Sequence, residues 1–294
     1  MRVLLTGSSG RVGRAVHHAL VDRGHAVLGF DRVPADSTDF VADLCDDGAL
    51  RSALKSADAV VHTAGLHAPH VGQRPDAEFE AVNVEATRRL VAHCAEFGIG
   101  TLVYTSTTAL YGQAATPGDA AGWVTEATTP GPRTVYHHSK LAAEALLRDA
   151  AAGGRLRVTV LRMSRCFPEP APLMAAYRLH RGVDVRDVAS AHARALAPAA
   201  SAYRCFVISG PTPFRTEDAT ALKHDAASVI GRRAPDLARA FEARGWALPT
   251  SIDRVYSSAA AQRELGWTPR FGHDEVVRQF DAGSPEVLAP PGGR

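Results

Sequence analysis

Apolar runs and helical patterns alternate along the first 165 residues of the chain. Six of the runs are rich in Val and Leu, several of them almost continuously, as in strands that are covered on both faces of a parallel sheet. The predicted strands are residues 2–6, 26–31, 40–42, 59–63, 101–106 and 157–163.

The segments between these strands have the periodicity of helices that pack on a sheet. Val12, Val16 and Leu20 repeat at intervals of four, and Gly24 follows where a helix would end. Longer helices are predicted over residues 75–98 and 134–152. Because strand-helix-strand crossovers are right-handed, the pattern predicts an α/β fold with a doubly wound parallel sheet.

A glycine-rich turn joins the first strand to the first helix, running from Thr6 into the helix. Glycines let the backbone approach a pyrophosphate closely, and the free N–H groups and positive end of the helix attract its charge. Because the motif lies between a strong strand and a strong helix, it predicts a Rossmann-type dinucleotide site. The residues assigned to this site are Gly7, Gly10, Arg11, Val12 and Gly13.

Two carboxylates end the next predicted strands. Asp31 lies about 20 residues beyond the turn, where it can accept hydrogen bonds from an adenosine ribose, which favours NAD. Its neighbour Arg32 could instead bind the 2′-phosphate of NADP, and both could be exposed turn residues. Asp43 with Leu44 could contact the adenine, or Asp43 could cap the helix that follows.

Tyr136 and Lys140 are four residues apart, on one face of a predicted helix. A free tyrosine titrates near pH 10, so proton exchange near neutrality needs about 4 kcal/mol, which a cation in a desolvated cleft can supply. A run of hydroxyls, residues 105–108, ends the strand before this helix. One of them could hold a substrate oxygen while Tyr136 transfers the proton, or the run could only cap the following loop.

With these motifs in this order, the chain resembles the extended short-chain dehydrogenases/reductases, the superfamily of NAD-dependent epimerases and dehydratases. The matching segments cover most of the chain: Thr6 to Gly13, Asp31, Asp43-Leu44, His62 to Gly65, Asn83 to Thr87, Thr105 to Gly112, Tyr136 with Lys140, Asp184 to Val188 and Leu265 to Pro269.

The resemblance implies a role for each matching side chain. Tyr136 would be the acid/base, Lys140 would lower its pKa and hold the nicotinamide ribose, and Thr107 would be the catalytic hydroxyl. The resemblance further implies a homodimer formed through helices near residues 78–97 and 134–152. Residues implied to line the cofactor are His62, Thr63, Ala64, Gly65, Asn83 and Met163.

Beyond residue 165 the chain is less regular and richer in proline. We therefore expect a dinucleotide-binding domain over residues 1–165, a smaller substrate-binding part over residues 166–282 that is interleaved with the last sheet elements, and a flexible tail over residues 283–294. Residues 112–133, rich in Gly, Ala, Thr and Pro, are expected to form a loop.

Departures from the resemblance narrow the chemistry. Thr108-Ala109 stands where the dehydratases have an Asp-Glu pair, so 4,6-dehydration is not expected. The short connection after the sixth strand leaves little chain to hold a nucleotide sugar. It contains Cys166-Phe-Pro-Glu-Pro170, which is similar to uronate dehydrogenases. Their carboxylate-binding arginine would fall near Met174, so a uronate substrate is in doubt.

Several side chains are candidates for contact with substrate. His67 and His70 follow the fourth strand on a loop that borders the pocket in this fold, although loop histidines are usually plain surface residues. No third ligand at credible spacing accompanies them, so no metal site is predicted. The remaining substrate candidates are Thr108, Ser164, Arg165, which could equally be structural, and Arg178. His137, His138, Glu126 and Asp187 are expected to have no catalytic role.

Composition narrows the class of partner. The formal net charge of +2 creates no strong field toward nucleic acid or anionic lipid, so a small-molecule partner is expected. The four cysteines are far apart, which favours reduced thiols. A hydrophobic strand begins at the first residues and leaves no room for a signal peptide, and no apolar run reaches membrane-spanning length, so the expected location is the cytoplasm.

These observations predict an NAD(P)-dependent oxidoreductase that moves hydride between nicotinamide and a carbinol or ketone carbon of a sugar, polyol or secondary metabolite. The alternative is a sugar epimerase that retains its NAD. A non-catalytic dinucleotide sensor is a third hypothesis, against which the intact Thr107, Tyr136 and Lys140 argue.

Overall fold

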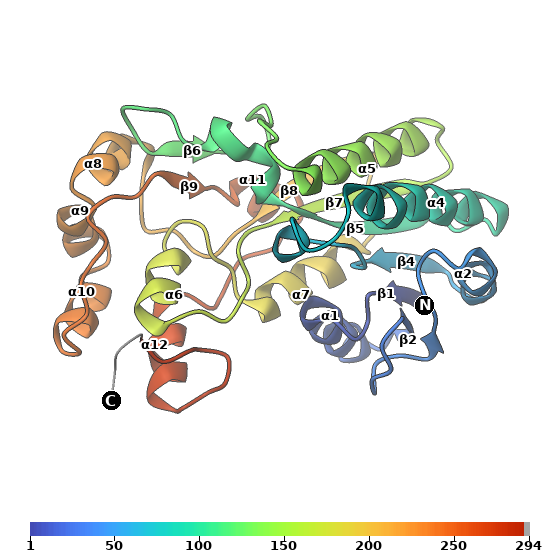
Figure 1. Cartoon of the computed structure of the whole chain (residues 1–294), viewed down its shortest axis with the longest axis horizontal. Helices are drawn as coiled ribbons and strands as arrows, with labels where there is room; N and C mark the ends of the chain where they lie inside the picture. The colour runs from blue at the N-terminus through green and yellow to red at the C-terminus, as the bar shows by residue number, and fades with distance from the viewer. Residues whose placement is uncertain (291–294) are drawn as a thin grey trace. The chain divides into compact units, whose positions relative to one another are not determined.

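A seven-stranded sheet with helices around it forms the body of the chain (Figure 1), which confirms the predicted α/β fold. The computed structural model describes residues 1–290. The strand order is β3-β2-β1-β4-β5-β7-β8. The strands are β1 (Arg2–Thr6), β2 (Ala26–Asp31), β3 (Phe40–Val41), β4 (Ala59–His62), β5 (Thr101–Thr107), β7 (Arg157–Met163) and β8 (Tyr203–Ile208).

The order of the strands reverses beside β1. This strand pairs in parallel with both β2 and β4, so that Leu4 lies opposite Leu28 on one side and Val60 on the other. In a doubly wound sheet the carboxyl ends of the two strands at such a reversal diverge into a crevice where ligands bind. The glycine turn follows β1 directly at this point.

Two compact units make up the chain. The first unit comprises residues 1–110, 132–162 and 188–206, and the second comprises residues 111–131, 163–187 and 207–290. Each unit therefore draws on three separate segments. The sequence analysis placed a boundary near residue 165 and expected the second part to be interleaved with the last sheet elements. The assignment of cofactor to one part and substrate to the other stays a prediction.

The core of the first unit lies between its strands and helices. Leu4, Val60, Leu102 and Val160, one from each of four neighbouring strands, are fully buried in it. Helices alternate with these strands along the chain, so both faces of the sheet are covered. The strands are therefore apolar along most of their length. The helices are α1 (Arg11–Val21), α2 (Asp47–Leu54), α3 (Asp76–Phe79), a π-helix (Glu80–Glu85), α4 (Ala86–Glu96) and α5 (Val135–Ala152).

The second unit has its own core, to which Met174, Phe214, Phe241 and Val276 contribute. A small parallel sheet, β6 (Gly122–Val124) with β9 (Arg254–Tyr256), belongs to it. The helices that lie in this unit are α6 (Ala171–Arg178), α8 (Ala219–His224), α9 (Ala226–Arg233), α10 (Pro235–Glu242), α11 (Ala259–Glu264) and α12 (His273–Asp281). Helix α7 (Val185–Ala195) begins at the end of one segment of the second unit and continues into the first.

The structure differs from the sequence analysis in the predicted loop, residues 112–133, and in the predicted flexible tail, residues 283–294. The predicted loop over residues 112–133 contains β6, whose partner lies some 130 residues further on and leaves no local signal. Within the expected tail, Val287 is buried and Leu288 exchanges backbone hydrogen bonds with Glu169 and Ala171. The last four residues of that expected tail, 291–294, lie outside the described residues.

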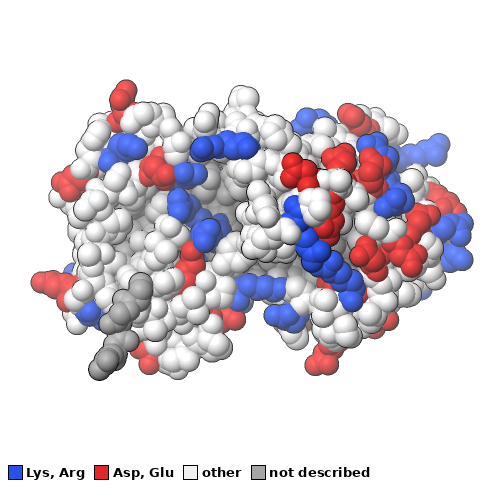
Figure 2. Space-filling model, viewed as in Figure 1, with Lys and Arg blue, Asp and Glu red and all other residues white. Residues whose placement is uncertain are grey.

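Charge on the visible surface is mixed. In Figure 2, Lys and Arg side chains lie among Asp and Glu side chains, in keeping with the net charge of +2. None of the helices formed by residues 1–290 is long and apolar enough to cross a membrane.

Candidate active site

The glycine turn is held so tightly that two of its positions require glycine. Gly7 has φ of +75°, and a Cβ there would lie 2.6 Å from the backbone nitrogen of Ala64. A Cβ on Gly13 would lie 1.9 Å from the carbonyl oxygen of Gly7, far inside van der Waals contact. The N–H of Gly7 also donates to the carbonyl of Phe30 at 2.8 Å, which fixes the turn against the end of β2.

No side chain caps the first turn of helix α1. Gly10 is the N-cap residue and supplies no side-chain cap, and the first turn carries no acidic residue. Arg11 and Val12 are half-buried beside it. The helix start therefore offers N–H groups and the positive end of the dipole to an anion.

Asp31 ties the end of β2 to this turn. Its carboxylate accepts from the N–H of Ser9 at 3.1 Å and from the N–H of Val33 at 3.0 Å, while Arg32 beside it is exposed. Asp43 accepts from the N–H of Cys45 at 2.8 Å and so closes a local turn.

The cap of α2 is a different residue, Asp46, which accepts from Ala49. Leu44 is buried in the core of the first unit. Neither observation places Asp43 or Leu44 on an adenine, and that role stays a prediction.

His62 is buried and takes part in a chain of hydrogen bonds. Thr87 donates its only hydroxyl proton to the carbonyl of Asn83 at 2.8 Å, so it accepts from His62 Nε2 at 3.0 Å. Nδ1 of His62 therefore accepts from Thr6 at 2.6 Å. Burial lowers the pKa of His62 to about 3. Both ring nitrogens of the neutral His62 are therefore hydrogen-bonded within the chain, and Thr63 donates its hydroxyl to the carbonyl of Thr6 at 2.7 Å. Contact of these two residues with the cofactor stays a prediction.

Asn83 sits in the π-helix, a rare element that often marks functional positions. Its amide holds the backbone of Leu66 through two hydrogen bonds, of 2.8 and 3.0 Å, and donates to Ser139 at 2.9 Å. Ser139 donates in turn to the carbonyl of Tyr136 at 3.0 Å. Asn83 thus joins the Gly65 segment to the helix that carries Tyr136 and Lys140. Ser139 was not among the residues predicted for the site.

Thr107 and Tyr136 are brought together as expected. The Thr107 hydroxyl accepts from the N–H of Ala109 at 3.1 Å, which leaves its proton free for the phenol. The hydrogen bond with Thr107 lowers the pKa of Tyr136, but burial outweighs it and raises that pKa to about 12. This direction is opposite to the one that the resemblance implies, because the Tyr136 side chain is only 7% exposed.

Burial acts on Lys140 as well. Its ammonium donates to the carbonyl of Thr105 at 2.7 Å and lies 4.3 Å from the centre of the Tyr104 ring. Burial lowers its own pKa to about 7, against which the charge of Glu144 acts to raise it. Burial therefore moves both members of the pair toward their uncharged forms.

His192, which the sequence analysis missed, holds Thr105 from α7. Its Nδ1 can only donate to the carbonyl of Val188, at 2.8 Å, so Nε2 accepts from the Thr105 hydroxyl at 2.7 Å. Burial lowers the pKa of His192 to about 4, which keeps the ring neutral. The segment on which Lys140 is anchored is thereby fixed from a second element.

A buried ion pair lies one helical turn beyond Lys140. Glu144 accepts from Arg162 at 3.0 and 2.6 Å and from Ser106 at 2.5 Å. Both charged side chains are at most 6% exposed. The pair fixes β5, β7 and α5 to one another within the first unit.

His67 lies near Lys140, whose charge contributes to lowering the pKa of the imidazole, with burial as the main cause. The rings of His67 and His70 are 4.4 Å apart, and His70 accepts from the N–H of His67 at 3.1 Å. Thr108 is buried at the end of the hydroxyl run. No group of three or more His, Cys, Asp or Glu side chains within residues 1–290 is arranged to hold a metal ion.

The other predicted substrate residues belong to the second unit. Ser164 and Arg178 are buried, while Arg165 is half-exposed and bonded to Glu169 at 2.6 Å. Met163, the predicted cofactor contact at the end of β7, is half-buried.

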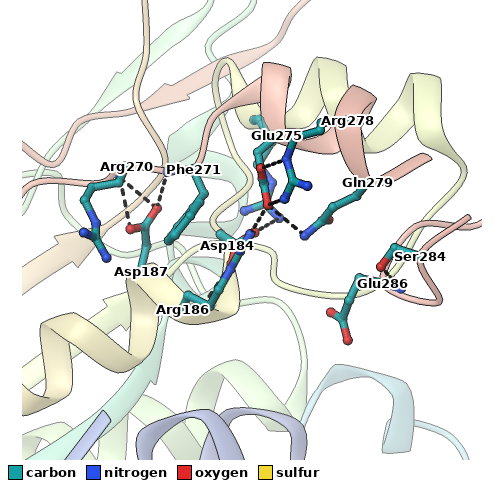
Figure 3. Close-up of polar contacts among 11 residues, drawn as sticks. Asp184, Arg186, Asp187, Arg270, Phe271, Glu275, Arg278, Gln279, Ser284 and Glu286 are labelled. Atoms are coloured by element: carbon teal, nitrogen blue, oxygen red, sulfur yellow. Dashed lines mark hydrogen bonds and ion pairs between the residues drawn. The ribbon is translucent and has the colours of Figure 1, made fainter. Parts of the chain in front are cut away.

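Asp187 and Glu126 are structural, as expected. Asp187 accepts from the N–H groups of Arg270 and Phe271 at 3.0 Å (Figure 3), and Glu126 accepts from the N–H of Val207 at 2.7 Å.

Comparison with known proteins identifies the family. The model of the NAD dependent epimerase/dehydratase family matches residues 3–171, more than half of the chain. The chain belongs to this family. It is 27% identical to a 2-alkyl-3-oxoalkanoate reductase of Stenotrophomonas maltophilia, over 97% of this chain and 99% of that protein. A UDP-glucose 4-epimerase of Azospirillum brasilense is 31% identical over 55% of this chain and 48% of its own length.

Solved structures of the same fold support the architecture. A short-chain dehydrogenase/reductase superfamily protein from Agrobacterium tumefaciens, determined with bound NAD, superimposes with a TM-score of 0.72 at 22% identity, over 95% of each chain. The UDP-glucose 4-epimerase of Thermus thermophilus in complex with NAD gives a TM-score of 0.70 at 24% identity, over 95% of this chain and 97% of that one.

NAD, the cofactor of the family, fits the residues of this chain. The glycine turn is a cradle that a Cβ at position 7 or 13 would fill, and the first turn of α1 is free of acidic side chains. A pyrophosphate can therefore approach the backbone there without displacing a side chain. The chain is an enzyme of the family's oxidoreductase or epimerase type.

Proposed function

We propose that the protein is an NAD-dependent oxidoreductase that interconverts a hydroxyl and a keto group on a small substrate. The observation that carries the proposal is the hydrogen bond of Thr107 with Tyr136, in the same unit as the glycine turn and one helical turn from Lys140. A non-catalytic binder has no need of a buried phenol poised in this way.

Each group has a separate task in this scheme. NAD, when bound, supplies the hydride acceptor or donor. Tyr136 holds or moves the proton at its phenolic oxygen, and Thr107 positions both that oxygen and a substrate oxygen with one hydroxyl. Lys140 in its ammonium form favours the phenolate, and Asn83 holds the helix that carries the pair.

NAD is proposed in preference to NADP because of Asp31. Its carboxylate points at the N–H of Ser9 in the glycine turn, 3.1 Å away, so it places negative charge where a 2′-phosphate would lie. Arg32 beside it is exposed. A comparison of the Kd values of NADH and NADPH tests this preference directly.

A ketone or carbinol substrate without a nucleotide is supported by two observations. A relative that matches nearly the full length of the chain is named a 2-alkyl-3-oxoalkanoate reductase. Only twenty residues separate Met163 from Asp184, which leaves a short segment for binding a nucleotide. The similarity to UDP-glucose 4-epimerases supports the second candidate, an epimerase that retains NAD.

Turnover with NADH separates these functions. We expect ketone-dependent loss of NADH absorbance with the wild type, a loss of at least about 1,000-fold in kcat for Tyr136→Phe, and unchanged NADH affinity in that variant. Tyr203→Phe, a half-buried tyrosine of β8, is the matched control. Isomerised product with no net change in NADH would establish the epimerase, and a Tyr136→Phe variant with every activity intact would refute catalysis by this phenol.

A further inference from the structure

Two consecutive residues of β5 hold the Lys140 ammonium within the first unit. The carbonyl of Thr105 accepts a hydrogen bond from it at 2.7 Å, and the centre of the Tyr104 ring lies 4.3 Å from the same nitrogen. A cation within about 6 Å of the centre of an aromatic ring is attracted to the face of that ring. The ring face of Tyr104 is therefore a second contact of this charge.

Burial strengthens the attraction between the two groups. Tyr104 is 1% exposed and Lys140 is 6% exposed. Cation-π attraction is at least about twice as strong between desolvated groups as at an exposed site. Burial also raises the pKa of Tyr104 well above its usual value, so its ring faces the ammonium as an uncharged phenol.

The ring and the carbonyl are each held in place by another element. Tyr104 lies opposite His62 in the register of β5 with β4, and the two rings are 5.5 Å apart. The Thr105 side chain is held by His192 of α7 at 2.7 Å. The Tyr104 hydroxyl, by contrast, is buried and has no hydrogen-bond partner among residues 1–290. The part of this residue that contacts the site is thus its face.

Four other titratable groups lie around Lys140. On its own helix these are Glu144, whose charge favours the ammonium, and Tyr136, whose pKa burial raises to about 12. The others are His62 on β4 and His67 on the loop that follows, and burial lowers the pKa of both imidazoles, to about 3 for His62. Between about pH 7 and 9, Glu144 is therefore the charged member of these four.

We infer that Tyr104 is a positioning residue of the reaction, because its ring face holds the Lys140 side chain in place as an ammonium ion. The inference rests on the proposed function for its effect on turnover, though not for its effect on Lys140. When Tyr136 gives its proton to the oxygen of a ketone, the charged Lys140 stabilises the phenolate that remains. A weaker ring face leaves fewer molecules with that charge, so the reaction slows most where Lys140 is already losing its proton.

Fluorination of the ring tests the inference with little change in packing. Tyr104→Phe keeps the ring face, and Tyr104→3,4,5-trifluorophenylalanine has nearly the same shape but a much weaker negative potential on that face. The chain has three lysines, Lys55, Lys140 and Lys223, so NMR of isotope-labelled lysine follows each titration, and Lys140→Met identifies the signal of Lys140. We expect its pKa to be about 7 in the wild type and in Tyr104→Phe, and lower by about 1 in the trifluorinated variant.

Turnover gives a second readout, with NADH at saturation and methyl acetoacetate, a neutral ketone, as the probe. From the fraction of ammonium, kcat of the trifluorinated variant should be lower than that of Tyr104→Phe by about 10-fold at about pH 8 but only about 2-fold at about pH 6. The same two substitutions at Tyr203 of β8, whose ring lies near Arg148 instead, are the matched control. They are expected to leave the pKa of Lys140 and kcat unchanged.

The two readouts separate failure of the inference from failure of the proposed function. If fluorination lowers the pKa of Lys140 but the wild type reduces no ketone, the role of the ring stands and the proposed function fails. An active enzyme in which fluorination leaves that pKa unchanged, or lowers kcat equally at both pH values, overturns the inference and supports the proposed function. Loss of turnover in Tyr104→Phe also overturns it, since the hydroxyl would then carry the role.

Discussion

Replacement of Lys140 by Met is expected to stabilise the protein at low pH while abolishing its activity. The side chain is 6% exposed, and among residues 1–290 its ammonium donates only to the carbonyl of Thr105, with the Tyr104 ring 4.3 Å away. Burial lowers the pKa of Lys140 from 10.5 to about 7, even though Glu144 acts in the opposite direction. The folded chain therefore carries this positive charge at a cost.

The fall in pKa corresponds to about 5 kcal/mol, because each pKa unit is worth about 1.4 kcal/mol. Below about pH 7 both folded and unfolded chains are protonated and the full cost is present. Between about pH 7 and 10.5 the unfolded chain keeps its proton and the folded chain loses it, so wild-type stability rises with pH by up to about 1.4 kcal/mol per unit. Met has no such charge and gives no such rise.

The substitution also removes a hydrogen bond and a cation-π contact, together worth about 1–3 kcal/mol. We therefore expect Lys140→Met to be about 2–4 kcal/mol more stable than the wild type near pH 6, and this advantage to disappear by about pH 9.

Urea denaturation followed by far-ultraviolet circular dichroism, from about pH 6 to pH 9 without nucleotide, measures the free energy of unfolding of both proteins. Lys55→Met, the same change at an exposed lysine of the first unit, is the control and should follow the wild-type profile. Parallel pH profiles for wild type and Lys140→Met would refute the argument, since they would show that the pKa of Lys140 is not lowered by folding.

Three further substitutions follow from the site. Gly13→Ala puts a Cβ 1.9 Å from a carbonyl oxygen of the turn, so NADH affinity, read by fluorescence titration, should fall at least about 10-fold; an unchanged Kd would contradict the assigned turn. Arg162→Met leaves Glu144 buried without its ion-pair partner and should cost about 3–5 kcal/mol in urea denaturation, and a loss below about 1 kcal/mol would be inconsistent with the pair. His192→Leu frees the Thr105 hydroxyl and should lower kcat about 10-fold with KM nearly unchanged, whereas a fall in Tm alone would assign His192 a purely structural role.

The strands of the first unit could be predicted from the sequence because each strand has a recognisable pattern within its own residues. The bounds of β1, β2 and β7 agree with the sequence prediction, and the remaining predicted strands differ by one residue at one end. Continuous Val and Leu runs between helical stripes have few other interpretations. The glycine turn was predictable for the same reason, since strand, glycines and helix are contiguous.

The parts that were missed depend on contacts between distant segments. β6 has three residues and pairs with β9 far along the chain, and β8 ends its sheet without a regular flanking pattern. His192 reaches Thr105 across 87 residues, and Arg162 reaches Glu144 from another element. Histidine or arginine alone in an apolar helix or strand gives no sign of which group it will bind.

Burial acts on Tyr136 and Lys140 as one constraint with two effects. It raises the pKa of the phenol to about 12 and lowers that of the ammonium to about 7, so in this structure the pair is near its uncharged state through much of the neutral and alkaline range. Any group that favours the phenolate and ammonium forms must therefore work against desolvation. Two groups of the first unit do so: Thr107, through its hydrogen bond to the phenol, and Glu144, through its negative charge one helical turn from Lys140. Because Arg162 neutralises much of that charge, the buried ion pair fixes the architecture of the site while limiting how strongly Glu144 can favour the ammonium.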